Sequence, residues 1–385
     1  AVRKNPNLKP ETTISKEIGA EVRLLDGRLT ADVTYYDKYT RDQIVESELS
    51  YLSNYQRVII NSGKISNKGW EISVSGVPVK VKNFEWKTIF NWSKNNSMVE
   101  SLPEGIDKIQ IGSGVYNVKS YAEVGKPYGA IYAKTFKRDA EGYILCQLDG
   151  SPKEGQDYEY LGCLQADWRG GWNNVFRLGN FSFSVMFDFQ KGGKFFSQTS
   201  IQSSVDGQSV KSLEGRDADF FSRKILGESD EERYGFMRPQ NANTPTANGQ
   251  IYPDWGRPKG VVLPNCRYDE DVEGLAGQQV LGYCTPERYW MHYTSRDISR
   301  FIYDASYVKL REITVSYDLP KKWLRKTPFQ TFRVAAVGRN IATLFANTPH
   351  GLDPQATSTT GNAQGFERGF NLPSATYGFD IKVSF

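Results

Sequence analysis

The last twelve residues of the chain, 374–385, alternate strictly between apolar and small or polar side chains. The apolar set is Ala375, Tyr377, Phe379, Ile381, Val383 and Phe385. Because successive side chains of a β-strand point to opposite faces, this period of two predicts a strand with one apolar face. The segment ends on an aromatic ring, which a soluble sheet would expose at a fraying terminus. A strand with its outer face in lipid explains both features, although the edge strand of a soluble sandwich has the same period.

The same alternation recurs through the chain and predicts about nine β-strands. Tight turns are expected at Asp26-Gly27, Lys82-Asn83 and Gly179-Asn180, where residues that favour turns interrupt the pattern. The strands are expected over 14–24, 29–39, 70–74, 84–92, 174–178, 181–189, 307–319, 329–343 and the terminal segment. Strands joined by such tight turns are antiparallel, so the predicted fold is all-β.

The predicted connections alternate between short and long. The short ones are the three tight turns and residues 320–328, and the long ones cover 46–66, 101–170, 192–303 and 346–373. A transmembrane β-barrel has short periplasmic turns and long extracellular loops, whereas a soluble sandwich has no reason to segregate them. The sequence therefore predicts part of a transmembrane antiparallel β-barrel in a bacterial outer membrane, with the carboxyl terminus in the periplasm. There is no run of about 18 apolar residues, the pattern of a transmembrane helix.

An odd number of strands has a physical consequence. Nine antiparallel strands that enter on one side of a membrane and leave on the other cannot close on themselves. Two sheet edges would remain, and each unpaired backbone group in hydrocarbon costs several kcal/mol. We therefore expect other strands, from the same protein or from another chain, to complete the barrel.

Charge and motifs argue against several functional classes. The chain has 48 Lys and Arg residues against 44 Asp and Glu residues, so a nucleic-acid-binding surface is not indicated. The phosphate-binding pattern G-x-x-x-x-G-K-[ST] and the hydrolase pattern G-x-S-x-G are absent. The only histidines are His292 and His350, and no C-x-x-C spacing occurs, which argues against zinc. We expect no enzymatic activity.

The four cysteines fall into two local pairs along the sequence. Cys146 and Cys163 form one pair, and Cys266 and Cys284 form the other. Four cysteines allow three connectivities, and two local disulfides are the expected arrangement in an oxidising compartment. Free thiols or a different pairing are the alternative.

Several motifs, in order along the chain, resemble the carboxyl-terminal part of the SusC/RagA family of TonB-dependent outer-membrane transporters. They are Asn5-Pro-Asn-Leu-Lys-Pro-Glu11, Val124-Gly-Lys-Pro-Tyr-Gly129, Gly170-Gly-Trp-Asn-Asn174, Asn180-Phe-Ser-Phe-Ser184, Asp304-Ala-Ser-Tyr-Val-Lys-Leu-Arg311, Gly338-Arg-Asn-Ile341 and Gly351-Leu-Asp-Pro354. The resemblance spans essentially the whole chain, residues 1–385. Residues 162–168 depart from it, because the family usually has prolines there.

The resemblance implies a barrel of about 22 strands with a plugged lumen, of which this chain would supply the last nine. The plug domain and the segment that contacts TonB would belong to an amino-terminal part outside this sequence. A SusD-like surface lipoprotein would cover the transporter as a lid, and the TonB complex would supply energy. The expected cargo is an oligosaccharide or, in some members, a peptide.

The longest predicted loop, 192–303, is the expected place for specificity, because binding residues concentrate on loops. Its aromatic residues are Tyr252, Trp255, Tyr268, Tyr283, Tyr289, Trp290 and Tyr293. Aromatic rings of this kind could stack on sugar rings or contact a lid protein. The alternative is that they pack the loop against itself or against the barrel rim.

An acidic cluster in the same loop begins like a calcium-binding loop. Asp269, Asp271 and Glu273 alternate and precede Gly274. An EF-hand is excluded, because Val280 occupies the twelfth position, where a bidentate Glu is needed. An irregular Ca²⁺ site is a candidate, and a solvated loop is its alternative. No other cofactor is expected.

Two rival functions are kept open. The first is a soluble β-sandwich that binds carbohydrate, which would partition into the aqueous phase without detergent. The second is a diffusion porin, which needs neither plug nor energy, so its uptake would be unchanged after deletion of TonB.

Overall fold

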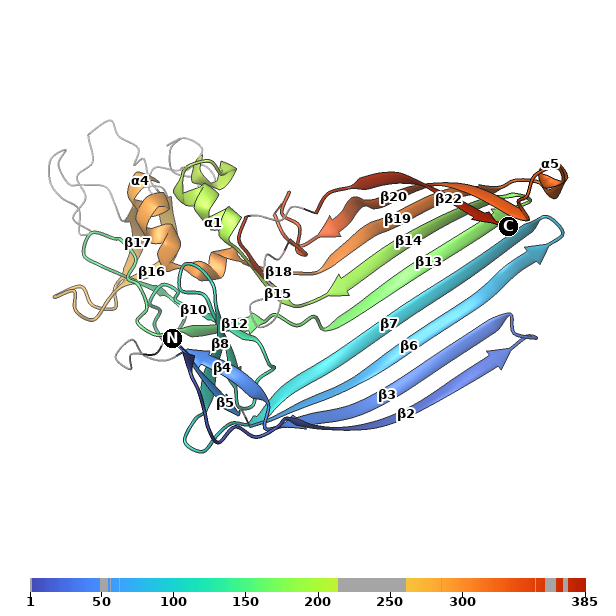
Figure 1. The fold of residues 1–385 in the computed structure, drawn as a ribbon. Helices are drawn as coiled ribbons and strands as arrows, with labels where there is room; N and C mark the ends of the chain where they lie inside the picture. The colour runs from blue at the N-terminus through green and yellow to red at the C-terminus, as the bar shows by residue number, and fades with distance from the viewer. Residues whose placement is uncertain are drawn as a thin grey trace.

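The computed structural model describes residues 2–48, 55, 57–61, 63–213, 261–284, 286–349, 351–356, 365–369 and 373–385. Its largest feature is one antiparallel sheet of nine strands (Figure 1). The strands, in spatial order, are β2 (Thr12–Leu24), β3 (Leu29–Arg41), β6 (Lys64–Val81), β7 (Phe84–Ser101), β13 (Trp168–Leu178), β14 (Phe181–Lys191), β19 (Tyr307–Asp318), β20 (Thr331–Ala346) and β22 (Thr376–Ser384). The predicted all-β fold of about nine antiparallel strands is confirmed. The sheet is curved and open, with β2 and β22 at its two edges.

Short connections join the strands at the end of the sheet drawn on the right of Figure 1. Between β2 and β3 the chain turns through Leu25, Asp26 and Gly27, whose φ angles are 57°, 52° and 80°. Three consecutive residues with positive φ form this turn, and the predicted Asp26-Gly27 lies at its centre, since Gly and Asp adopt such angles more readily than most residues. The β13–β14 hairpin turns at Gly179 (φ 57°) and Asn180, also as predicted. The short helix α5 (Lys321–Leu324) lies in the fourth connection, before β20.

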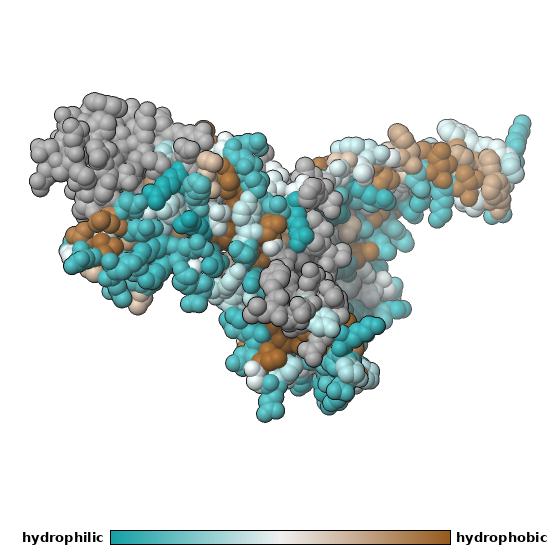
Figure 2. Space-filling view, turned by 60° about the vertical axis from the view of Figure 1, so that its left-hand side comes forward, coloured by the Kyte–Doolittle hydropathy of each residue, from teal (hydrophilic) through white to brown (hydrophobic). Residues whose placement is uncertain are grey.

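One face of the sheet is apolar and uncovered. Phe176 on β13 stacks between Trp86 of β7 and Phe183 of β14, with ring centroids 5.8 and 6.2 Å apart. On β22, Tyr377 and Phe379 are 77% and 86% exposed. Figure 2 shows hydrophobic residues on the surface of the part of the molecule at the upper right of the view. A soluble sandwich would bury these rings against a second sheet, and no such sheet covers them among the described residues.

The long connections lie at the other end of the sheet and fold into small sheets of their own (Figure 1). The strands of the connections are β4 (Ile44–Glu48), β5 (Arg57–Asn61), β8 (Lys108–Ser113), β9 (Lys119–Glu123), β10 (Ala130–Ala133), β11 (Ile144–Cys146), β12 (Glu159–Cys163), β15 (Lys194–Ser197), β16 (Val261–Tyr268), β17 (Gln279–Cys284), β18 (Ile302–Asp304) and β21 (Phe366–Glu367), and β1 (Val2–Arg3), which precedes β2, pairs with β5. They were predicted only as loops, because strands of two to eight residues give too short an alternation to detect.

Helical segments also lie in these connections. They are α1 (Gln198–Val205), η2 (Val210–Leu213), α4 (Pro286–Arg288), η3 (Tyr289–Tyr293), η4 (Thr294–Arg296) and η5 (Ile298–Phe301). Among the described helices, none has the length and apolar character needed to cross a membrane.

The buried cores of the chain lie at the end of the large sheet that carries the long connections, and one of them joins Ile65 of β6 and Val99 of β7 to β8 and β9. Another core surrounds Phe196, Ile201 and Phe366, which join β15, α1 and β21. A third gathers β11, β16, β17 and the η3 helix around Tyr289 and Trp290. The large sheet therefore has the pattern of a wall with two exposed faces, and its connections form a packed cap at one end.

Candidate functional site

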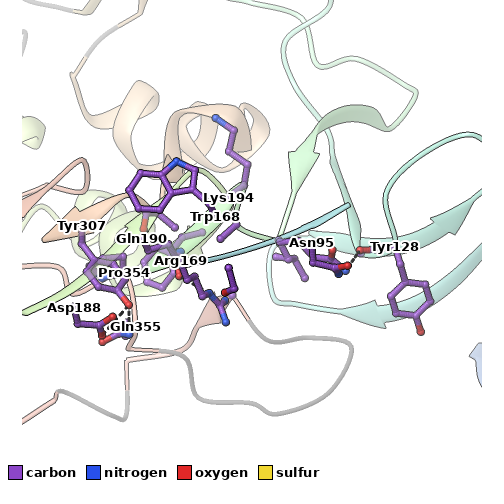
Figure 3. Close-up of a pocket in the computed structure, with 18 of the residues that line it drawn as sticks. Asn95, Tyr128, Trp168, Arg169, Asp188, Gln190, Lys194, Tyr307, Pro354 and Gln355 are labelled. Atoms are coloured by element: carbon purple, nitrogen blue, oxygen red, sulfur yellow. Dashed lines mark hydrogen bonds between the residues drawn. The ribbon is translucent and has the colours of Figure 1, made fainter. Parts of the chain in front are cut away.

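A cavity of about 720 Å³ opens where the inner face of the large sheet meets the folded connections (Figure 3). Its wall consists of side chains near the ends of β7, β13, β14 and β19, together with residues from β15 and from irregular segments. The polar lining residues are Ser93, Asn95, Gln165, Arg169, Asp188, Gln190, Lys194 and Gln355, with Tyr128 and Tyr307. A concave, mixed polar and apolar cavity of this size is the expected form of a ligand site.

Strand register explains why these side chains meet. Arg169 of β13 pairs with Ser93 of β7 on one side and with Gln190 of β14 on the other. The next register position carries Gly170, Trp92 and Phe189, which belong to the opposite, apolar face. The same period that gives the sheet its apolar outer face therefore places Arg169 and its neighbours on the inner face.

One corner of the cavity is closed by a network of charged side chains. The Asp188 carboxylate accepts hydrogen bonds from the Arg311 guanidinium and from the Tyr307 hydroxyl, the latter at 3.3 Å. Arg311 also donates to the side-chain oxygen of Gln355 at 2.7 Å. Lys309, which is 4% exposed, pairs with Asp353 at 2.5 Å. This network fixes the Asp188 carboxylate and neutralises its charge.

Two cations in the cavity have different surroundings. Arg169 donates from Nε to the Gln190 side chain at 3.1 Å and is exposed. The methylene groups of Lys194 lie over Gly162, where a Cβ added to the glycine would come within 2.6 Å of the lysine Cγ. Gly162 also has a φ of +120°, so no other residue fits there without strain. Glycine at 162 thus leaves room for the Lys194 side chain beside the cavity.

A carboxylate near Lys194 is held by other groups. Asp304 accepts hydrogen bonds from the Ser306 backbone N–H and from the Asn347 side chain, at 2.9 and 3.0 Å. Burial would raise the pKa of Asp304, but these hydrogen bonds and the nearby charge of Lys194 lower it. Asp304 therefore remains ionised, and its hydrogen-bonding capacity is taken up within the loop.

A second cavity, of about 420 Å³, continues along the inner face towards the short turns. It shares Ser93, Arg169 and Asp188 with the first and adds the carboxylates Asp32 and Glu71. Arg169 lines both cavities, and Glu71 lies across the strands from it at the same register position.

The predicted calcium residues do not form a metal site. Asp269 is buried and forms ion pairs with Lys137 and Lys153, each at 2.8 Å, and Asp271 pairs with Lys153. Burial alone would raise the pKa of Asp269, but the hydrogen bonds from the two lysines lower it to about 2. Glu273 is exposed. Among the described residues, no group of three or more His, Cys, Asp or Glu side chains is arranged to hold a metal ion.

Four of the aromatic residues predicted to contact a ligand or a lid protein lie inside the cap. Tyr268, Tyr289, Trp290 and Tyr293 are at most 3% exposed and pack in the core around β16 and β17. Tyr252, Trp255 and the side chain of Tyr283 lie outside the described residues. Packing of the loop against itself, the alternative to ligand stacking, accounts for the four that are described.

The cysteines are also arranged differently from the prediction. All four are free thiols. The β11–β16 strands are parallel and bring Cys146 next to Cys266, while Cys163 lies on β12 in another sheet and contacts the Tyr128 carbonyl. Cys284, on β17, belongs to the same core as Cys146 and Cys266. The fold thus brings Cys146, Cys266 and Cys284 together and keeps Cys163 apart from Cys146, the neighbour that the sequence spacing predicted for it.

Comparisons with known proteins agree with this architecture. Residues 1–184 match the family model "TonB dependent receptor-like, beta-barrel". The chain is 25% identical to TonB-dependent receptor P3 of Formosa agariphila over 97% of its own length and 33% of that protein. It is 29% identical to TonB-dependent receptor SusC of Bacteroides thetaiotaomicron over 27% of its own length and 10% of that protein.

Solved structures share the fold. The RagAB peptide importer in its closed-closed state matches with a TM-score of 0.62 at 17% identity, over 99% of this chain and 36% of that chain. The RagAB peptide transporter matches with a TM-score of 0.61 over the same fractions. The chain thus spans about a third of the length of the relatives that it matches over nearly its whole length. The barrel-family match, the curated relatives and the shared fold together show that this chain is similar to the barrel segment of SusC/RagA-like TonB-dependent receptors.

Proposed function

We propose that this chain forms part of the wall and the outer mouth of an outer-membrane transporter that imports oligosaccharides with energy from the TonB complex. The observation that carries the proposal is the division of one sheet into an uncovered apolar face and a polar inner face with a cavity at its capped end. Lipid would contact the first face, and cargo would pass along the second. The carboxyl terminus and the short turns would then face the periplasm.

The two sheet edges define the first partners. Within the described residues, β2 and β22 each pair with only one strand of the sheet. Unpaired backbone groups are too costly in hydrocarbon, so further strands of the same transporter complete the barrel. A plug domain within that barrel, and the segment that engages TonB, would come from parts of the protein outside this sequence.

The cap at the other end is the proposed contact for a SusD-like surface lipoprotein. Its small sheets lie at the end of the large sheet where the cavity is found, and there a lid would hold cargo before transport. Peptides are the second candidate cargo, because solved structures with a similar fold include a peptide transporter and a peptide importer. No bond of the cargo is broken in this proposal, and the relatives are named as receptors and transporters rather than enzymes.

Uptake by cells tests the proposal. The gene for the full-length protein is disrupted, and growth is followed on defined oligosaccharides and on defined peptides as sole carbon sources. We expect growth on one class to be lost, and lost equally when TonB is deleted. Growth that requires this gene but not TonB would indicate a diffusion porin and would overturn the proposal.

A further inference from the structure

Charged side chains on the outer face of the large sheet gather at the capped end of β2, β3, β6 and β7, which lie side by side (Figure 1). On β2 the outward positions from Leu24 to Ile18 are apolar, and the next outward position towards the cap is Lys16. The other three strands repeat this pattern, because a largely apolar outward run ends at a charged residue on each. The four charged residues are Lys16, Asp37, Lys68 and Lys94.

Strand register places these four residues together on one face. Lys16 pairs with Asp37, and Asp37 pairs with Lys68, so these three form one row across β2, β3 and β6. Lys94 of β7 pairs with Trp70, which lies two residues from Lys68, so Lys94 is a diagonal neighbour of Lys68. Neighbouring strands are about 4.8 Å apart and diagonal neighbours about 7–8 Å apart. The three lysines therefore form one basic patch.

An aromatic pair indicates where this basic patch lies relative to a membrane. Tyr35 and Trp70 occupy the outward positions just before Asp37 and Lys68, with ring centroids 5.0 Å apart. Tyrosine and tryptophan rings concentrate where the hydrocarbon of a membrane meets the headgroups. Lys94 is level with Trp70, and Lys68 lies two residues beyond it, roughly 7 Å at about 3.3 Å per residue. The patch is therefore at the level expected for lipid headgroups.

The basic patch has more positive charge than its neighbours neutralise. Lys68 forms an ion pair with Asp37 at 3.2 Å. Lys16 and Lys94 are exposed, and within the described part of the chain neither forms an ion pair. Two of the three ammonium groups are therefore available to a ligand. An excess of exposed lysines at the level of the headgroups attracts anionic lipid.

We propose that the basic patch binds the phosphate group of a phosphorylated glycolipid in the outer leaflet of the membrane. The outward side chains beside it, such as Ile18 and Trp70, would contact the acyl chains of the same lipid. Lysine binds phosphate as a point charge on a flexible stem, so the three ammonium groups need not meet at one atom. The inference rests on the proposed function, which places the capped end at the cell surface. Free phosphate would offer the same charge, and a competition with inorganic phosphate separates the two.

Lipid binding to the purified full-length transporter in detergent provides the test. Phosphorylated lipid A and a dephosphorylated lipid A with the same acyl chains are titrated, and bound lipid is counted by native mass spectrometry. We expect the phosphorylated lipid to bind at least about tenfold more tightly, with an affinity that falls as salt rises. Equal binding of the two lipids would overturn the proposal. Displacement of the phosphorylated lipid by inorganic phosphate at an equal concentration would also overturn it, because the site would then recognise phosphate alone.

Three single variants and a control locate the site. Lys16→Gln, Lys68→Gln and Lys94→Gln should each weaken binding of the phosphorylated lipid about fivefold, as expected for one lysine near a membrane surface. Lys38→Gln is the matched control, because Lys38 is exposed next to Asp37 on the same strand but belongs to the inner face. Unchanged binding in the three variants, or an equal loss in the control, would contradict the assignment.

The proposed function can fail separately from this inference. If the three variants lose the phosphorylated lipid but cargo uptake by cells is independent of TonB, then the lipid site stands and the transport mechanism does not. If uptake requires TonB but the three variants bind the lipid normally, then the transporter stands and the lipid site does not. Heat-modifiable migration of each variant on gels verifies that its barrel has folded.

Discussion

At the scale of single residues, the capping domain depends on a few buried charges. The Asp269 side chain is 4% exposed and accepts hydrogen bonds from two lysines of a different long connection, the one between β7 and β13. Its neighbour Asp271 pairs with one of the same lysines but is 70% exposed. The sequence pattern around these two carboxylates resembled a metal loop, yet the lysines that occupy them, Lys137 and Lys153, lie more than a hundred residues earlier. No local motif could indicate that partnership.

Asp269→Asn is expected to loosen the cap. The change leaves the lysines without their shared carboxylate and should cost roughly 1–3 kcal/mol of local stability. Hydrogen exchange of the β16 and β17 amides measures this directly and should accelerate. Asp271→Asn is the matched control and should change exchange little, because an exposed ion pair contributes less than about 1 kcal/mol. Equal exchange in the two variants would contradict this account of the cap.

The same residue gives a pH dependence with a defined sign. The pKa of Asp269 is about 2 in the folded cap, below its ordinary value of 3.8. The stabilisation is therefore complete above about pH 4 and is lost as the pH falls towards 2. Digestion with pepsin should release residues 261–284 at pH 2 far faster than at pH 4. At pH 4 pepsin should digest the Asp269→Asn variant faster than the wild-type protein. The digestion rate of the variant should also differ less between pH 4 and pH 2.

The buried thiols are expected to be free and unreactive. Burial raises the pKa of Cys284 to about 12, and a hydrogen bond with Cys266, together with burial, raises that of Cys146. Since the thiolate is the reactive form, these cysteines should resist a maleimide in the folded protein and react after denaturation without a reductant. Peptide mapping by mass spectrometry checks this. Peptides that become labelled only after reduction would reveal disulfides and contradict the free-thiol arrangement.

At the scale of elements, alternation predicted the strands of the large sheet but not their full length. The strand expected at 70–74 is β6, which covers Lys64–Val81. Its first residues carry polar side chains on both faces, because that part rises above the apolar band into the cap. Alternation of apolar and polar residues therefore predicts only the part of a strand whose outer face is apolar, and misses the part that extends into the cap.

The cavity was missed for a related reason. Arg169, Asp188 and Lys194 come from two sheet strands and one short cap strand, and each is only a polar residue at a strand end in the sequence. Their meeting follows from the register of β13 and β14 and from the fold of the connection that follows. The sequence pattern instead pointed to the aromatic residues of the longest loop as ligand contacts. Four of these residues pack in a core of the cap.

An outward substitution on β22 tests the apolar face. Phe379→Arg would place a charge in the lipid-facing band and should cost about 2–4 kcal/mol near the bilayer midplane. Lower amounts of folded protein in the outer membrane and a lower unfolding temperature are expected. Asp380→Asn, the adjacent residue on the inner face, should leave both unchanged. The account of the two faces would be wrong if the two variants behaved alike.

At the scale of the whole molecule, the chain is a curved wall with two open edges and a folded cap. The apolar outer face and the unpaired edges are stable together only if lipid covers the former and further strands pair with the latter. The inner face then encloses a lumen, and the cavity beside Arg169 lies at its entrance. The polar side chains of this wall include both signs of charge, Arg169 beside the carboxylates Asp32, Glu71 and Asp188.

The central claim, that alternate residues of these strands face lipid and lumen, can be measured on β22 in the full-length protein. Nitroxide labels are placed singly at residues 377–384 in lipid bilayers, and their collision rates with oxygen and with a water-soluble nickel complex are compared. The account predicts a period of two, with 377, 379, 381 and 383 accessible to oxygen and the residues between them accessible to nickel. Equal access of the nickel complex to both sets would contradict it.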